Sequence, residues 1–162
     1  MRRRGDKNRL GGWLLPLFLL LPFVGITQTK SFLQRFGALA DSLATEYQIP
    51  RAVILGVSII ESSAGTSRNC KLLNNYFGIV GKNDLKKQGI KTRYKQYELP
   101  RESFIHFCKV LSKKKFYKKL KGNNHYMLWT QAMSDHGYSE VPETWRQRIN
   151  AAIRKNKLSS TP

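Results

Sequence analysis

The feature that most constrains the fold is an apolar run that ends in a carboxylate. Residues 52–60 read Ala-Val-Ile-Leu-Gly-Val-Ser-Ile-Ile, and Glu61 follows directly. Pro50 precedes the run and suits the first position of a helix, so we expect a helix over residues 51–62. Because this helix is apolar nearly all round, it should lie at the centre of the domain. Glu61 is then expected at the C-terminal end of a core helix.

Such a position favours the protonated form of a carboxyl group. Poor solvation raises the pKa of a carboxyl, and the negative end of the helix dipole also disfavours its charged form. A carboxyl that keeps its proton near neutral pH can serve as a general acid. The simpler interpretation is an exposed Glu61 at a frayed helix end, and the neighbouring segments bear on this choice.

Apolar residues recur at spacings of three and four in four further stretches, which predicts amphipathic helices with one buried face. Ser31 is the expected N-cap of the first of them, and Pro100 precedes another. The four stretches are residues 31–47, 101–111, 126–136 and 144–157.

Between these helices, residues 65–97 are rich in Gly, Asn, Ser and Lys. Residues 76–80 and 92–97 are expected to form two strands of a small β-hairpin, joined by turn residues. The predicted fold class is therefore mainly α (α+β), with one helical domain and no internal repeat.

Residues 1–29 are predicted to be an export signal or an N-terminal membrane anchor. Five basic residues within the first nine precede the apolar run 13–26. The run is shorter than the roughly 20 residues of a spanning helix and contains two prolines, which favours cleavage. No Ala-x-Ala site is present, so an uncleaved anchor remains the alternative. In either case residues 30–158 should lie in the periplasm or cell envelope, ahead of a disordered tail at 159–162.

The chain is strongly basic, with 29 Lys and Arg against 10 Asp and Glu and a formal net charge of +19. This excess predicts an anionic partner, which is nucleic acid, anionic lipid or an acidic wall polymer. Export argues against nucleic acid and favours anionic polymers of the cell envelope. The Lys-rich residues 113–119 are either a solvated helix end or a surface that attracts a polyanion.

The two cysteines, Cys70 and Cys108, either form a disulfide, which an oxidising compartment would allow, or remain buried free thiols. Neither belongs to a CxxC pair, and the three histidines are scattered, so no metal site or cofactor is expected. A Cys-His nucleophile could be built from Cys108, but this residue falls on the buried face of its helix.

Four segments occur in an order that is typical of one family. They are 61-Glu-Ser-Ser-Ala-Gly-65, 74-Asn-Asn-Tyr-Phe-Gly-Ile-79, residues 94–104, and 132-Ala-Met-Ser-Asp-His-Gly-Tyr-138. Together they resemble the bacterial endo-β-N-acetylglucosaminidases of glycoside hydrolase family 73, a group that includes the flagellar-rod muralytic domain and many autolysins. The resemblance covers about residues 32–158.

The resemblance implies a lysozyme-like helical fold with a small hairpin, and hydrolysis of β-1,4 bonds of peptidoglycan on the N-acetylglucosamine side. Glu61 matches the catalytic acid of the family. Tyr138 matches a tyrosine that is expected to line the cleft near this acid.

Further matching positions imply contact with the substrate. Asn75, Phe77 and Gly78 match a segment whose role is partly structural, since Asn can hold a turn and Gly permits a special backbone conformation. Tyr94 and Tyr97 match aromatic hairpin positions, which serve either cross-strand packing or the stacking of sugars.

The sequence departs from the family pattern in two places. Ser63 stands where many relatives carry Gly, and 139-Ser-Glu-Val-141 replaces the usual Ala-Thr-Asp. Glycoside hydrolysis generally uses two carboxylates. The predicted hairpin offers only Asp84 as a base or water-positioning group, and assistance by the substrate's acetamido group is the alternative.

Three hypotheses follow for the function. The first is a peptidoglycan endo-β-N-acetylglucosaminidase, and the second is a lytic transglycosylase that leaves 1,6-anhydromuramyl ends. The third is a non-catalytic module for wall binding or assembly, which the missing second acid favours. The segment 74–79 and the late Gly-Tyr pair favour the first hypothesis.

Overall fold

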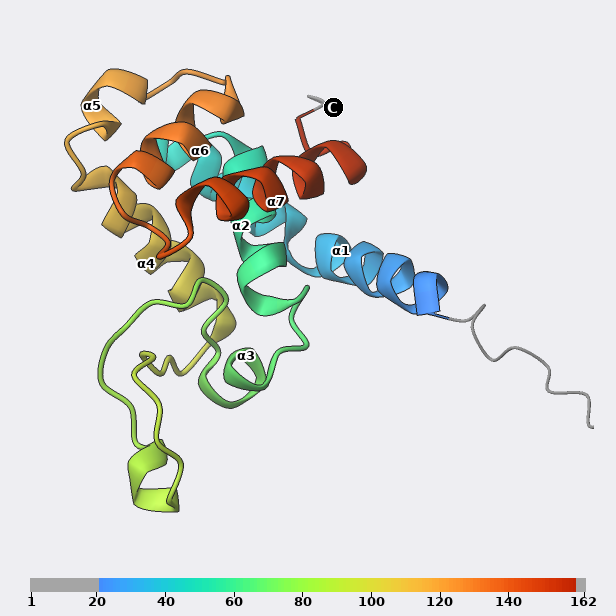
Figure 1. Ribbon diagram of the computed structural model, residues 1–162, viewed down its shortest axis with the longest axis vertical. Helices are drawn as coiled ribbons and strands as arrows, with labels where there is room; N and C mark the ends of the chain where they lie inside the picture. The colour runs from blue at the N-terminus through green and yellow to red at the C-terminus, as the bar shows by residue number, and fades with distance from the viewer. Residues whose placement is uncertain (1–20, 160–162) are drawn as a thin grey trace, which may run out of the picture.

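The computed structural model describes residues 21–159, and this part of the chain is mainly α, as predicted. It forms seven α-helices and one short 3-10 helix (Figure 1). The α-helices are α1 (Leu21–Tyr47), α2 (Arg51–Ser62), α3 (Arg68–Leu73), α4 (Pro100–Ser112), α5 (Tyr117–Leu120), α6 (Tyr126–Asp135) and α7 (Pro142–Lys155), and the 3-10 helix is η1 (Leu85–Gln88).

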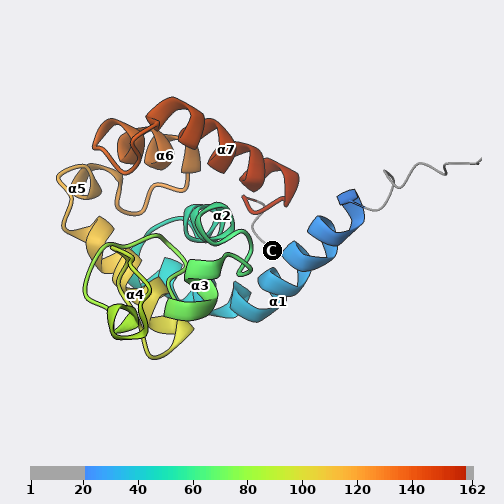
Figure 2. The same ribbon diagram turned by 60° about the horizontal axis from the view of Figure 1, so that its bottom comes forward.

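Helix α2 lies at the centre of the domain, as its composition predicts. Figure 2 shows α6 and α7 on one side of it and α1 and α4 on the other. Every residue from Ala52 to Ile59 is buried, including the polar Ser58, whose hydroxyl donates to the Leu55 carbonyl at 2.9 Å. Because apolar side chains point from α2 in all directions, the surrounding elements bury all of them except Ile60, which is partly buried.

The end of α2 is fixed directly after Glu61. Ser63 adopts the left-handed conformation (φ 51°), and its N–H turns back toward the carbonyls of Ile59 and Ile60. The Ser62 hydroxyl donates to the Ser58 carbonyl at 2.6 Å and accepts the Gly65 N–H at 2.9 Å. These bonds satisfy groups that a helix end leaves free, and they hold Glu61 in the last turn.

Residues 76–97, called the arm below, correct the predicted β-hairpin. The arm contains no β-strand, and one antiparallel bridge joins Val80 to Tyr94. Asparagine side chains donate hydrogen bonds to backbone carbonyls that would otherwise accept from a partner strand. The Asn75 amide donates to the Lys95 carbonyl at 2.8 Å, and the Asn83 amide donates to the Tyr94 carbonyl at 2.9 Å. Side-chain bonds of this kind compete with regular strand pairing, so the arm folds as an irregular loop pair.

The base of the arm is packed into an aromatic cluster. Phe36 of α1 stacks on Phe104 of α4 with ring centroids 4.8 Å apart, and Phe77 stacks on Phe107 at 4.2 Å. Tyr76 packs edge-on against Phe36 at 4.9 Å. Aromatic pairs at these separations add to the free energy of area burial, so the start of the arm is anchored to two helices.

Several predicted boundaries also need correction. Helix α1 is already formed at Leu21, the first described residue, so Ser31 is an interior residue rather than an N-cap. Helices α3 and α5 were not predicted, because half of the residues in each are polar and each forms only one or two turns. Cys70 and Cys108 are both buried free thiols, which decides the open choice against a disulfide.

The predicted signal or anchor falls largely outside the described residues, which begin at residue 21. Within residues 21–159, no helix has the length and apolar character that a membrane crossing requires. Of the predicted tail, Ser159 lies in a turn at the end of the described chain, and residues 160–162 lie outside it.

The contact between α2 and α7 generates a stability prediction at Gly56. A Cβ added at Gly56 would lie 2.6 Å from Cγ1 of Ile153, which is fully buried. Overpacking of this kind typically costs about 1–3 kcal/mol, which outweighs the roughly 1 kcal/mol that Ala gains over Gly in a helix. We expect Gly56→Ala to lower the free energy of unfolding measured in urea.

The matched control is Gly37→Ala in α1, where the added Cβ meets only Nη2, at the far end of the Arg51 side chain, at 3.3 Å. This variant should be at least as stable as the parent. Equal stability of Gly56→Ala and the parent would contradict the packing of α2 against α7.

Candidate active site

A cleft of about 680 Å³ lies between the arm and the loop that joins α6 to α7 (residues 136–141), and Glu61 contributes to its lining. The arm supplies one wall through Phe77–Val80 and Arg93–Tyr94, and the α6–α7 loop supplies the other through residues 137–141. Val110 and Lys114 complete the lining. Four segments that are far apart in the sequence therefore meet around the end of α2.

Glu61 is partly buried and has one strong partner. The indole Nε1–H of Trp145, from α7, donates to Glu61 Oε1 at 2.6 Å. Burial raises the pKa of the Glu61 carboxyl above its ordinary value, and the Trp145 hydrogen bond and the charge of Arg148 partly offset this rise. The carboxyl is thus held in one orientation while its proton is retained to higher pH than in water.

Gly78 allows the arm to approach this carboxyl closely. Its backbone is in the left-handed region (φ +65°), and a Cβ placed there would lie 3.4 Å from Glu61 Oε2 and 3.8 Å from the Tyr94 ring. A side chain at residue 78 would be strained and would crowd the carboxyl. Gly78 therefore keeps the space beside Glu61 and Tyr94 open.

Tyr138 connects the two walls of the cleft. Its hydroxyl donates to the Phe77 carbonyl at 3.2 Å, and its ring centroid lies 5.0 Å from that of Trp145. Burial, with the charge of Glu61 as a second cause, raises the pKa of Tyr138 well above its ordinary value, so its hydroxyl stays protonated. Tyr138 is thus a neutral hydrogen-bond donor beside the acid.

Asn75 supports the cleft from behind rather than lining it. Its amide group donates to the carbonyls of Ile79 and Lys95, both at 2.8 Å, and its Oδ1 accepts the N–H of Phe77 at 3.3 Å and of Ile79 at 3.1 Å. Every polar position of this buried side chain is used by the backbone of the arm. The structural role that the sequence predicts for Asn75 is therefore accounted for in full.

Asp84 and Tyr97 lie in a different hollow, of about 600 Å³, on the arm. The Asp84 carboxylate is exposed and pairs with Lys87 Nζ at 2.9 Å, while the Tyr97 hydroxyl shares a hydrogen bond with His106 Nδ1 at 2.7 Å. Neither residue lines the cleft that contains Glu61. The catalytic role of Asp84 and the sugar-binding role of Tyr97 stay predictions.

Three residues of this site were not foreseen from the sequence as site residues: Trp145, Arg93 and Glu140. Trp145 was recognised only as an apolar residue of the last helix. The only feature of the sequence that hints at a polar role for Trp145 is a general one: a buried indole N–H needs a hydrogen-bond acceptor. Arg93 and Glu140 face each other across the cleft at 3.4 Å, and their 47-residue separation leaves no pattern in the sequence.

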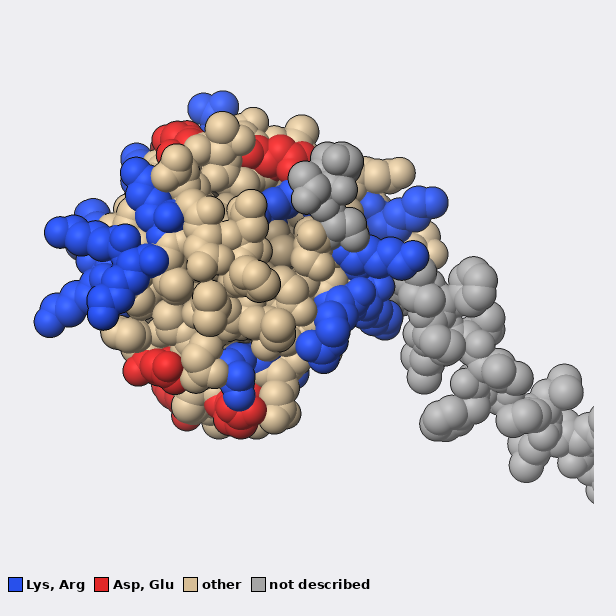
Figure 3. Space-filling model, turned by 90° about the horizontal axis from the view of Figure 1, so that it is seen from above, with Lys and Arg blue, Asp and Glu red and all other residues tan. Residues whose placement is uncertain are grey.

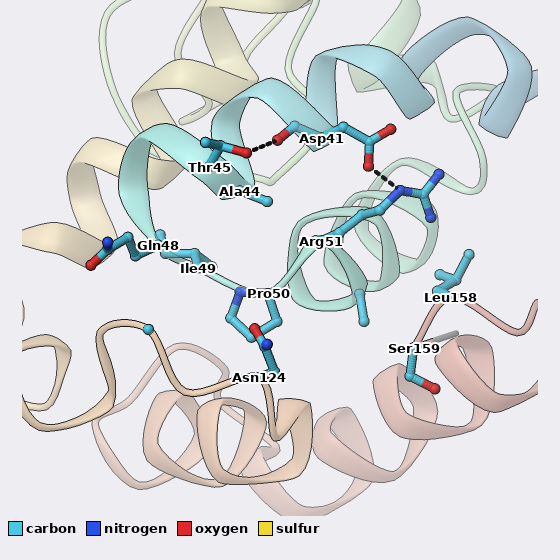
Figure 4. A pocket seen from close by; sticks show the side chains of 12 residues that line it. Asp41, Ala44, Thr45, Gln48, Ile49, Pro50, Arg51, Asn124, Leu158 and Ser159 are labelled. Atoms are coloured by element: carbon cyan, nitrogen blue, oxygen red, sulfur yellow. Dashed lines mark hydrogen bonds and ion pairs between the residues drawn. The ribbon is translucent and has the colours of Figure 1, made fainter. Parts of the chain in front are cut away.

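Another hollow, of about 590 Å³, lies at the opposite end of α2 (Figure 4). Asp41 and Arg51 pair there at 2.6 Å and point toward each other. Ten residues of helix separate Arg51 from Glu61, which is about 15 Å. In the described part of the chain, no group of three or more His, Cys, Asp or Glu is placed to hold a metal ion.

A mainly helical domain with a partly buried carboxyl in a cleft is the arrangement of a lysozyme-like glycosidase. The sequence matches the Glucosaminidase family, described as mannosyl-glycoprotein endo-beta-N-acetylglucosaminidase, over residues 37–158. The protein therefore belongs to this family of glycoside hydrolases, which is family 73, and the resemblance seen in the sequence is confirmed.

Two solved structures share the fold. The catalytic domain of the autolysin Auto from Listeria monocytogenes matches with a TM-score of 0.66 and 22% identity, over 82% of this chain and 86% of that domain. A type VI secretion system effector-immunity complex from Pseudomonas protegens matches with a TM-score of 0.59 and 21% identity, over 82% of this chain and 95% of that one. No curated protein matches the sequence.

The hydrogen bond from Trp145 generates a prediction about Glu61. Trp145→Phe removes the N–H that stabilises the charged carboxylate, so the pKa of Glu61 should rise further above its ordinary value. A carboxyl-carbon NMR titration measures this pKa, with Glu61→Gln used to assign the resonance.

Trp129→Phe is the matched control, because the Trp129 indole donates to the Asn123 carbonyl at 2.9 Å and makes no contact with Glu61. The pKa of Glu61 should be unchanged in this variant. A fall in the Glu61 pKa on Trp145→Phe would show that the indole does not favour the charged form.

Proposed function

We propose that this protein is an endo-β-N-acetylglucosaminidase that hydrolyses β-1,4 glycosidic bonds of peptidoglycan, with Glu61 as general acid. The observation that carries the proposal is the placement of Glu61, a partly buried carboxyl with a raised pKa that lines the cleft between the arm and the α6–α7 loop. The family match supports the bond type and, through the family, peptidoglycan as substrate.

The proposed reaction requires that the Glu61 carboxyl be protonated when the substrate binds. Cleavage of a glycosidic bond produces an alkoxide-like leaving oxygen, and a positioned acid lowers the barrier by protonating it. Glu61 Oε1 accepts the bond from Trp145, and Oε2 is the oxygen nearest to Gly78. We assign the transferred proton to Oε2, because that oxygen faces the open space beside Gly78 and Tyr94.

The walls suit a carbohydrate. Tyr94 offers an aromatic face at the cleft, and Arg93 lies over its ring at 5.8 Å from the centroid. Tyr138 adds a neutral hydroxyl, and Ile79 with Val80 adds apolar surface. Sugar rings have apolar faces and hydroxyl edges, so a site of this mixed kind can hold a glycan without a metal ion or cofactor.

Replacement of Glu61 by Gln tests the proposal. The amide keeps the shape and can still accept the Trp145 N–H but has no acidic proton to transfer, so digestion of purified sacculi should fall by about 10²–10⁴-fold. Mass spectrometry of the parent digest should find reducing N-acetylglucosamine ends. Digestion by Glu61→Gln at the parent rate would refute the assignment, and 1,6-anhydromuramyl ends would identify a lytic transglycosylase.

The free energy of unfolding in urea is the control that shows whether Glu61→Gln is folded. The pKa of Glu61 is higher in the folded than in the unfolded protein, so ionisation disfavours the folded state as pH rises through this window. Glu61→Gln should therefore be at least as stable as the parent in urea at pH 7.5. The difference in stability should shrink as pH falls below 4.5, the ordinary pKa of this carboxyl, because Glu61 then becomes protonated in both states.

We also propose that the enzyme acts in the cell envelope and that its basic surface holds it on anionic polymers. The lysines at 113, 114, 115, 118, 119 and 121, around α5, are all exposed. Figure 3 shows Lys and Arg gathered on the side of the molecule where α5 lies. The location rests on the predicted signal or anchor in residues 1–29, and attachment through residues 13–26 is part of that proposal.

Charge removal on this surface gives a separate prediction. The triple variant K115Q/K118Q/K119Q changes residues that do not line the cleft. We expect weaker binding to sacculi at low salt and a smaller dependence of binding on ionic strength, because fewer charges attract the polymer. Hydrolysis of a short soluble glycan should keep the parent rate. Unchanged sacculus binding would identify these lysines as an ordinary solvated helix end.

A further inference from the structure

The cleft contains a second carboxylate that the sequence did not single out. Among the described residues that line the cleft, the acidic side chains are Glu61 and Glu140. Glu140 lies in the α6–α7 loop, where this chain departs from the family pattern, and it is 79 residues away from Glu61 in the sequence. The two carboxyl groups enter one cleft from different elements.

Their surroundings differ in the way that acid and base roles require. Glu61 is partly buried, and burial raises its pKa. The side chain of Glu140 is 87% exposed and pairs with Arg93 Nη2 at 3.4 Å. An exposed carboxylate can reach a water molecule and accept its proton, whereas a desolvated one is suited to keep and donate its proton.

The Arg93–Glu140 contact also links the two walls of the cleft. Arg93 belongs to the arm and Glu140 to the α6–α7 loop, and both side chains are mainly exposed. Exposed ion pairs are weak because water screens them, so an entering glycan can separate the pair. Separation leaves the Glu140 carboxylate within the cleft and free to contact a water molecule.

We propose that Glu140 is the second catalytic carboxylate and acts as the general base that activates water. This inference rests on the proposed function of Glu61 as general acid. It assigns the acid to α2 and the base to the α6–α7 loop, and a reaction that uses an acid and a base with no covalent intermediate is that of an inverting glycosidase.

The step balances in protons and bonds. The water oxygen forms a bond to the anomeric carbon while Glu140 accepts one water proton. The bond from the anomeric carbon to the leaving oxygen breaks, and Glu61 gives its proton to that oxygen. Glu140 is then protonated and Glu61 is charged, and exchange of one proton through solvent restores the starting state. The β-linked substrate yields an α-configured reducing end.

Glu140→Gln, assayed in the full chain, tests the proposal. Digestion of a soluble peptidoglycan glycan should fall by about 10²–10⁴-fold, the usual contribution of a general base. Sodium azide should restore turnover, because azide attacks the anomeric carbon without a base, and the product should be the α-glycosyl azide. NMR of the parent reaction should show the α-anomer first. A lost fold or a lost ion pair would not be rescued by azide.

Matched variants separate the outcomes. Glu143→Gln removes a nearby exposed carboxylate that pairs with Arg146 and does not line the cleft, so it should keep the parent rate. If Asp84→Asn lost activity while Glu140→Gln kept it, Asp84 would be the base and the proposal would be overturned. Full activity of both, with a β-anomer formed first, would overturn it in favour of the acetamido group. Full activity of Glu61→Gln would instead refute the proposed function itself.

Discussion

The burial of α2 is the constraint on which the rest of the structure depends. A helix that is apolar on every side must be surrounded, and α1, α6 and α7 are the helices that pack against it. This packing brings Trp145 of α7 to the end of α2, where its indole meets Glu61 at 2.6 Å. The same contact that hides apolar surface therefore sets the environment of the proposed acid.

The site keeps a carboxyl group where its charge is poorly solvated. Burial raises the pKa of Glu61, and the bond from Trp145 limits the rise, so the group can give up its proton and still be stabilised afterwards. Tyr138, whose pKa is raised as well, adds a neutral hydroxyl and not a second charge. A site of this kind lowers the stability of the folded protein at neutral pH in return for an acid that keeps its proton to higher pH than an exposed carboxyl does.

The arm is held by side chains where a hairpin would be held by strand pairing. The side-chain amides of Asn75 and Asn83 donate to the carbonyls of Lys95 and Tyr94, and Phe77 is stacked on Phe107 of α4. The anchored base fixes Gly78 beside Glu61, while Arg93, further along, is exposed and bonded only weakly to Glu140. One wall of the cleft is thus firm near the proposed acid and loosely closed at its outer edge.

The sequence alone determined the central helix, its limits at Arg51 and Ser62, and the family, because apolar periodicity and ordered short segments are local signals. It also predicted that Glu61 would have a raised pKa. It failed for the arm, since the Asn side chains that replace a strand ladder bond to residues up to 20 positions away. Only the tertiary structure placed Asp84 outside the cleft and brought Arg93 and Glu140 into its lining. It also placed the indole of Trp145 within hydrogen-bonding distance of Glu61. Those neighbours are set by the packing of α7 against α2 and by the path of two loops, and contacts across 47 to 84 residues have no local pattern to reveal them.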